Sequence, residues 1–160
     1  MTKANVLVVE DEFIVSKDIQ SSLKKLGYNV VGAAPSGEKA LELLEANQPD
    51  IVLMDIMLKG EMNGIETAEI VRNQYSIPVI YLTAYADEAT LSKAKVTEPY
   101  GYILKPFKEI DLHTSIEMAL YKHKKEQEVE RERDMLYSLV ENKEKDESEK
   151  NKYEFDHHFI

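Results

Sequence analysis

Four charged residues in this sequence each follow a short apolar run, a position where a strand could present a reactive side chain. They are Glu10, Asp11, Asp55 and Lys105. An acid in such a position commonly does no more than cap the next turn. Three carboxylates held close together would instead repel one another and would suit a hard cation such as Mg²⁺, which prefers carboxylate oxygens and water as ligands. The elements that carry these residues decide between the two interpretations.

Apolar and amphipathic segments alternate along the first 120 residues. The β-rich runs are 5–9, 28–34, 50–55, 77–83 and 100–104. Helical patterns occupy 13–26, the stretch between Ser36 and Pro49, the stretch after the loop 58–64, then 87–97, and a last stretch that begins near Phe107. Strands that alternate with helices predict an α/β domain with a doubly wound parallel sheet.

The predicted sheet would bring the acids together. Five parallel strands commonly take the flavodoxin-like order 2-1-3-4-5, and ligands bind beyond the carboxyl ends of the strands, where the strand order reverses. That switch point lies between the first and third strands, so Glu10, Asp11 and Asp55 are expected to meet there. Lys105 would add one positive charge, which leaves a local charge that a divalent cation could balance.

This set of groups could carry phosphoryl chemistry. A bound cation would neutralise the pocket and offer free positions to a phosphate, and the Asp55 carboxylate could then attack phosphorus to give an acyl phosphate. Thr83 ends the fourth predicted strand and offers a hydroxyl. Thr83 and Lys105 would stabilise charge on the oxygens of the transferring group.

The constellation closely resembles the receiver domain of two-component response regulators, over about residues 1–120. Each matching motif is weak alone, but their order and spacing along five strands make the set specific. The motifs are "VVEDE" (8–12), "LMDIML" (53–58), "MNGIE" (62–66), "YLTAY" (81–85) and "LKPF" (104–107).

The resemblance implies a role for each site residue. Asp55 would be the phosphoacceptor. Glu10 and Asp11 would hold Mg²⁺ together with Asp55 and the backbone carbonyl of Met57, and Thr83 and Lys105 would contact the phosphoryl oxygens. Tyr102 matches the aromatic residue that turns inward when the threonine moves toward the phosphate.

The resemblance also implies partners. A histidine kinase would be the phosphodonor. A downstream protein would bind the face made by the fourth helix, the fifth strand and the fifth helix. The chain would catalyse only its own phosphorylation and dephosphorylation, so it is not expected to be an enzyme acting on a separate substrate.

Two other functions stay open at this stage. The domain could be an interaction module that works without phosphate. It could also be a magnesium-dependent phosphatase that uses an aspartyl-phosphate. That chemistry usually needs a second acid two residues after the nucleophile, and Met57 occupies that position.

Composition excludes several classes. The chain contains no cysteine and has a net charge of −10, without the basic patch of a nucleic-acid binder. No apolar run approaches the length of a membrane span, and the N-terminal apolar run is too short for a secretory signal. We therefore expect no nucleic-acid or membrane partner, and a cytoplasmic location.

The composition changes after the predicted α/β domain, which we place at residues 1–121. Residues 122–141 are predicted to form a helical extension that could act as a signalling helix. Residues 142–160 form a polar tail, which is predicted to be disordered because it is highly charged and poor in apolar residues. A homodimer formed through the extension is left open.

Overall fold

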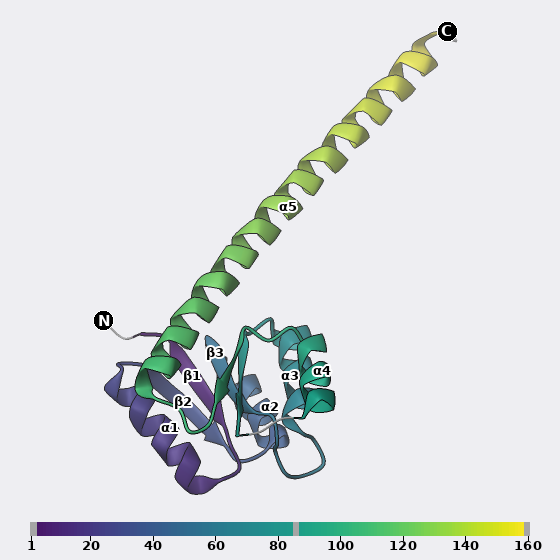
Figure 1. Ribbon diagram of the computed structural model, residues 1–160. Coiled ribbons are helices and arrows are strands. Elements are labelled where there is room, and N and C mark those ends of the chain that lie inside the picture. Colours follow the sequence, from purple (N-terminus) through teal and green to yellow (C-terminus); the bar gives the residue numbers. More distant parts are fainter. Residues whose placement is uncertain (1–2, 85–86, 159–160) are drawn as a thin grey trace. The chain divides into compact units, whose positions relative to one another are not determined.

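The computed structural model describes residues 3–84 and 87–158, with side chains described up to residue 150. Strands and helices alternate from the N-terminus, as the sequence predicts (Figure 1). The strands are β1 (Asn5–Val9), β2 (Asn29–Ala34), β3 (Ile51–Asp55), β4 (Val79–Thr83) and β5 (Gly101–Leu104). The helices are α1 (Phe13–Lys25), α2 (Gly37–Ala46), α3 (Gly64–Ile70), α4 (Glu88–Val96) and α5 (Glu109–His158), and a π-helical turn (Val71–Tyr75) follows α3.

The five strands form one parallel sheet in the order β2-β1-β3-β4-β5. The predicted α/β class and strand order are therefore confirmed. Because β1 lies between β2 and β3, the chain reverses its direction of winding at β1 and β3. The ends of these two strands carry the predicted acids.

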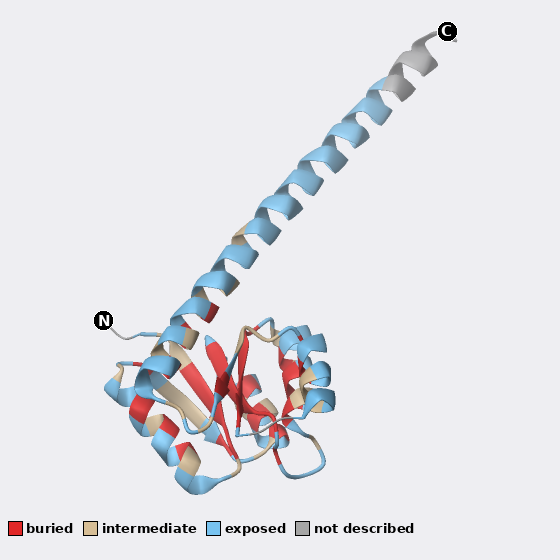
Figure 2. Cartoon of the chain, viewed as in Figure 1, coloured by how far each residue is buried: buried red, intermediate tan, exposed pale blue. Residues whose placement is uncertain are grey.

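The central strands of the sheet are buried (Figure 2). Alternate residues of each central strand belong to two separate apolar cores, one on each face of the sheet. One core joins the sheet to α2, α3 and α4 through residues such as Leu44, Ala68 and Ala94. The other joins it to α1 and the start of α5 through residues such as Leu23 and Leu112. Burial on both faces explains why the central strands read as continuous apolar runs.

Local sequence signals fix several helix starts. The Ser36 side chain accepts a hydrogen bond from the Lys39 N–H and caps α2, as its sequence position predicts. Asn63 and Glu66 form a reciprocal capping box at α3. Gly64, the first residue of α3, has no room for a side chain, because a Cβ there would overlap the backbone carbonyl of Asp55. The glycine thus lets α3 begin directly against the end of β3.

The C-terminal helix is longer than predicted. Instead of ending near residue 141 and giving way to a disordered tail, α5 continues to His158. Residues 142–158 contain no glycine or proline and are rich in glutamate and lysine, which are good helix formers. High charge and few apolar residues favour disorder, but they do not prevent a helix whose backbone hydrogen bonds are made internally.

The chain divides into two compact units, Met1–Lys122 and His123–Ile160. The first contains the sheet and both cores. The second consists of the remainder of α5, and every residue from 129 to 150 is exposed. No described helix is both long enough and apolar enough to span a membrane.

Candidate functional site

The carboxyl edge of the sheet collects the predicted site residues. Glu10 and Asp11 follow β1, Asp55 is the last residue of β3, Thr83 is the last residue of β4, and Lys105 follows β5. Since parallel strands end at the same edge, residues far apart in the sequence become neighbours there.

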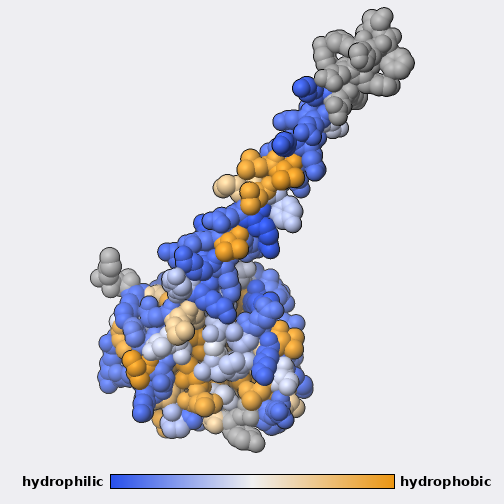
Figure 3. All heavy atoms as spheres, turned by 45° about the horizontal axis from the view of Figure 1, so that its top comes forward, coloured by the Kyte–Doolittle hydropathy of each residue, from blue (hydrophilic) through white to orange (hydrophobic). Residues whose placement is uncertain are grey.

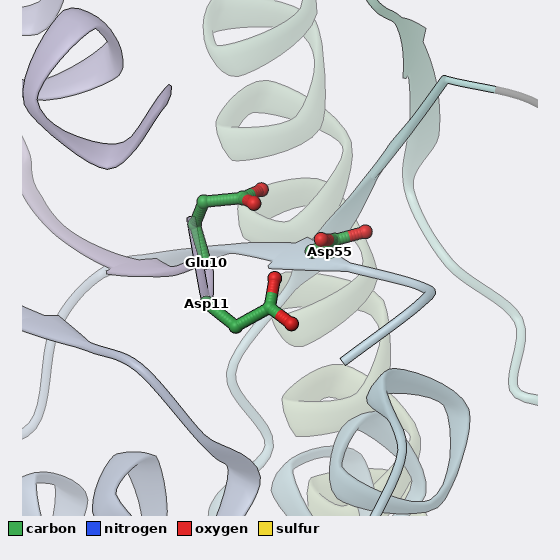
Figure 4. A group of neighbouring side chains, drawn as sticks. All are labelled: Glu10, Asp11 and Asp55. Atoms are coloured by element: carbon green, nitrogen blue, oxygen red, sulfur yellow. The ribbon is translucent and has the colours of Figure 1, made fainter. Parts of the chain in front are cut away.

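The three acids form one cluster. Oxygens of Glu10, Asp11 and Asp55 lie within 4.8 Å of one another. Figure 4 shows the three carboxylates projecting toward a shared space, two from the end of β1 and one from the end of β3. Glu10 and Asp55 are buried, with 2% and 4% of their surface exposed, while Asp11 is half-buried. A compact set of oxygen donors with excess negative charge fits a hard divalent cation.

Lys105 provides the positive charge beside the acids. Its Nζ lies 2.7 Å from Glu10 Oε2 and 3.5 Å from Asp55 Oδ2. Burial alone would lower the pKa of Lys105, but the hydrogen bond to Glu10 and the charge of Asp55 raise it overall. The lysine therefore stays charged, and one ammonium faces three carboxylates.

The pKa of Glu10 reflects its burial and the excess negative charge of this cluster. Burial, together with the charge of Asp55, raises the pKa of Glu10 to about 7, although the hydrogen bond from Lys105 opposes the shift. The local charge is thus not balanced by protein groups alone. A cation placed between the acids would favour the ionised form of Glu10.

Backbone donors hold the other two acids in place. The Met57 N–H donates to Asp55 Oδ1 at 3.0 Å, and the Lys59 N–H donates to Asp11 Oδ2 at 3.2 Å. Both donors come from the loop after β3, so this loop orients acids from two strands. Met57 itself lines the pocket and has a largely exposed side chain. Its predicted role as a carbonyl ligand stays a prediction.

Thr83 brings a buried hydroxyl to the carboxyl edge of the sheet. The residue is 1% exposed, and its Oγ1 has no hydrogen-bond partner among the residues that the structure describes. An unpaired buried hydroxyl costs about 1–3 kcal/mol. This donor lies at the same sheet edge as Asp55 and Lys105, where a bound anion could accept its hydrogen bond.

Tyr102 lies in β5 next to Tyr81 of β4. The two residues are register partners, and their ring centroids are 5.9 Å apart. The Tyr102 side chain is 38% exposed, so it does not fill the core. The Lys105–Pro106 peptide bond that follows β5 is cis.

Asp11, Asp55 and Lys105 line an open pocket of about 670 Å³. Two further residues in its wall, Thr90 and Lys93, come from α4 and were not predicted from the sequence. The helical pattern of 87–97 is weak, and it gives no sign that this helix faces the acids. Asp87 caps α4 by accepting a hydrogen bond from the Thr90 N–H.

The model for the response regulator receiver domain family matches residues 6–117. This match covers more than half of the chain, and the fold and the acid cluster agree with it. The chain therefore belongs to the response regulator receiver domain family.

Individual relatives agree with this assignment. The transcriptional regulatory protein PdtaR of Mycobacterium tuberculosis is 34% identical over 115 residues, which is 72% of this chain and 56% of that protein. The chain thus spans about half the length of this curated relative.

Two solved structures are also similar. The signal receiver domain of a modulated diguanylate cyclase from Desulfovibrio desulfuricans G20 has 40% identity and a TM-score of 0.75, covering 77% of this chain and 98% of that one. The N-terminal domain of a response regulator/sensory box/GGDEF 3-domain protein from Carboxydothermus hydrogenoformans has 36% identity and a TM-score of 0.71, covering 76% and 98%.

Proposed function

We propose that this protein is a phosphorylation-controlled switch in a two-component pathway, with Asp55 as the phosphoacceptor and Mg²⁺ as the required cation. The observation that carries the proposal is the buried Asp55 carboxylate at the end of β3, beside two further acids and one lysine. A structural turn residue would not need two further acids and a largely buried ammonium around it.

The phosphodonor would be a phosphohistidine of a histidine kinase. An Asp55 oxygen attacks phosphorus, a P–O bond forms, and the P–N bond to imidazole breaks. Glu10, Asp11 and Asp55 would hold Mg²⁺, which when bound would supply positive charge against the phosphoryl oxygens. Lys105, whose Nζ lies 3.5 Å from Asp55 Oδ2, would add a second positive charge.

The Thr83 hydroxyl would respond to phosphorylation of Asp55. It is buried near the pocket without a partner among the described residues, so a phosphoryl oxygen would supply the acceptor that it lacks. Movement of Thr83 toward the phosphate would vacate space for the half-exposed Tyr102 ring. This would change the face made by α4, β5 and α5, which is the proposed contact for a downstream protein.

We further propose that the chain acts on no separate substrate and catalyses only its own phosphorylation and dephosphorylation. The position two residues after Asp55 holds Met57, whose side chain is exposed and cannot serve as a general acid. A phosphatase of the aspartyl-phosphate type would need an acid near that position.

Intact mass after incubation with Mg²⁺ and acetyl phosphate tests the proposal. We expect one phosphoryl adduct on the wild type, none on Asp55→Asn, and none when the metal is chelated. Asp18→Asn, which removes an exposed carboxylate on α1, is the matched control and should label like the wild type.

Two outcomes would contradict the proposal. An unlabelled wild type, both with acetyl phosphate and with phosphorylated kinases, would favour a phosphate-independent interaction module. Release of many phosphates per chain from a small phosphoester would favour the phosphatase.

A further inference from the structure

The part of α5 in the second unit carries an apolar surface in the middle of an otherwise charged helix. Figure 3 shows this hydrophobic cluster along the extension, bounded by hydrophilic residues on both sides. Its members are exposed by half or more of their surface: Val129, Met135, Leu136, Tyr137, Leu139 and Val140. A cluster of this kind on a solvated helix marks a contact surface.

Helical spacing places only some of these apolar residues on one stripe of the helix. Val129, Leu136 and Leu139 are spaced by seven and three residues, so they lie along one stripe of the helix. The same spacing places Glu132 and Lys143 on the stripe, one on each side of the leucine pair. We call these five residues the seam. Its apolar part is short, and its two charged members decide what it can pair with.

A second copy of this helix can meet the seam in two directions. In a parallel pair each seam residue faces itself, so Glu132 would meet Glu132 and Lys143 would meet Lys143. In an antiparallel pair centred on the leucines, Leu136 faces Leu139, and Glu132 faces Lys143. Both pairs bury the leucines. Only the antiparallel pair replaces two like-charge contacts with two opposite-charge contacts.

The register of the antiparallel pair is also defined. The sum of the facing residue numbers is the same for the leucine pair and for the Glu132–Lys143 pair, so one alignment satisfies both. A shift by one heptad would place Leu136 against Glu132 and lose both features. The two-fold symmetry of the pair makes each favourable contact occur twice.

We propose that residues 129–143 form a self-association surface on which a second copy of this chain binds in antiparallel orientation. Charge complementarity between Glu132 and Lys143 sets the direction, and Leu136 and Leu139 supply the buried contact. The surface lies wholly within the second unit, so the proposal does not rest on phosphorylation of Asp55.

Charge reversal in the full chain tests both the association and its direction. The mass measured by light scattering or sedimentation should rise with wild-type concentration from the 18.4 kDa of one chain toward twice that value. Glu132→Lys alone and Lys143→Glu alone each create like-charge contacts and should weaken association by about tenfold. The double reversal restores the opposite charges and should recover association. Glu141→Lys makes the same charge change off the seam and should leave association near the wild-type level.

Cross-linking separates the two directions independently. The chain has no cysteine, so single-cysteine variants report on one position each. When Glu132→Cys and Lys143→Cys chains of different mass are mixed and oxidised, the antiparallel pair predicts the mixed disulfide. Helix content by circular dichroism should be unchanged in all these variants and serves as the folding check.

Three results would overturn the proposal. The first is a wild type that stays monomeric at every concentration, which would assign the seam to a different partner. The second is association that the charge reversals do not change, which would place the contact in the first unit or in a parallel pair. The third is self-disulfides at 132 and 143 in place of the mixed product, which would show a parallel pair.

Discussion

At the scale of single residues, Glu10 is a buried carboxylate in a cluster with excess negative charge. Its side chain is completely buried, it accepts a hydrogen bond from Lys105 at 2.7 Å, and it belongs to the same acid cluster as Asp55. Lys105 cannot offset all three carboxylates, so the proton of Glu10 is held more tightly in the folded chain than in water. Its protonation should therefore be coupled to folding and to cation binding.

We predict that Glu10 makes the metal-free protein less stable as the pH rises. The pKa of Glu10 is about 7 in the folded chain and 4.5 when unperturbed. Between these values the folded state holds a proton that the unfolded state has lost. The contribution is therefore fully present below about 4.5 and is lost as the pH rises through about 7. The change attributable to Glu10 should be on the order of 3 kcal/mol.

Urea unfolding in a chelator across this pH range measures the effect. The difference in unfolding free energy between the wild type and Glu10→Gln isolates Glu10 from the histidines, which titrate in the same range. Mg²⁺ should stabilise the wild type more at high pH than at low pH. Parallel pH curves for the two proteins would show that Glu10 does not have the raised pKa.

At the scale of elements, Tyr81 connects β4 to the end of α4. Its ring is fully buried, and its hydroxyl lies 2.6 Å from the hydroxyl of Thr97, the residue that ends α4. Thr97 in turn donates to the carbonyl of Ala94. The Tyr81 ring also lies beside the ring of Tyr102 in β5. This contact fixes one end of the helix that lines the pocket.

We predict that Tyr81→Phe lowers the free energy of unfolding by about 1 kcal/mol. The substitution keeps the buried ring and removes only the bond to Thr97, whose hydroxyl retains Ala94 as a partner. Chemical denaturation measures the change. Tyr137→Phe, which removes a hydroxyl from a side chain that is 63% exposed, is the control and should have no effect. Equal stability of Tyr81→Phe and the wild type would show that this hydrogen bond makes no net contribution to the free energy of unfolding.

At the scale of the whole molecule, α5 serves two units with different requirements. Its first turns bury Leu112, Ile116 and Ala119 against the sheet. In the second unit every residue from 129 to 150 is exposed, and the helix contains local ion pairs such as Lys125–Glu128 and Glu130–Arg133. The same helix is thus a core element in the first unit and an exposed one in the second.

We predict that matched leucine truncations separate these roles. Leu112→Ala removes a completely buried side chain and should cost the receiver domain about 2–5 kcal/mol. Leu139→Ala removes a side chain that is 59% exposed and should change receiver stability by less than about 0.5 kcal/mol. Thermal unfolding followed by tyrosine fluorescence compares the two. A large loss of stability in Leu139→Ala at concentrations where the chain is monomeric would contradict the division into two units.

The sequence by itself determined the fold class and the residues at the ends of the strands, whereas the strand order was taken as the common one for five parallel strands and is confirmed by the structure. Apolar runs that alternate with amphipathic ones leave few topologies, and acids that end adjacent strands must then meet. The motifs around Asp55, Thr83 and Lys105 made the family recognisable, and the family model confirms it. Composition predicted a disordered tail, whereas α5 continues to His158; composition measures the lack of a core and does not exclude an exposed helix.

Only the tertiary structure decided how the site is balanced. Lys105 lies closer to Glu10 than to Asp55, and Thr83 is buried without a partner among the described residues. Helix α4 contributes Thr90 and Lys93 to the pocket wall. Each of these features depends on distances between segments far apart in the chain. Burial and charge proximity set the raised pKa of Glu10, and neither can be read from residue types.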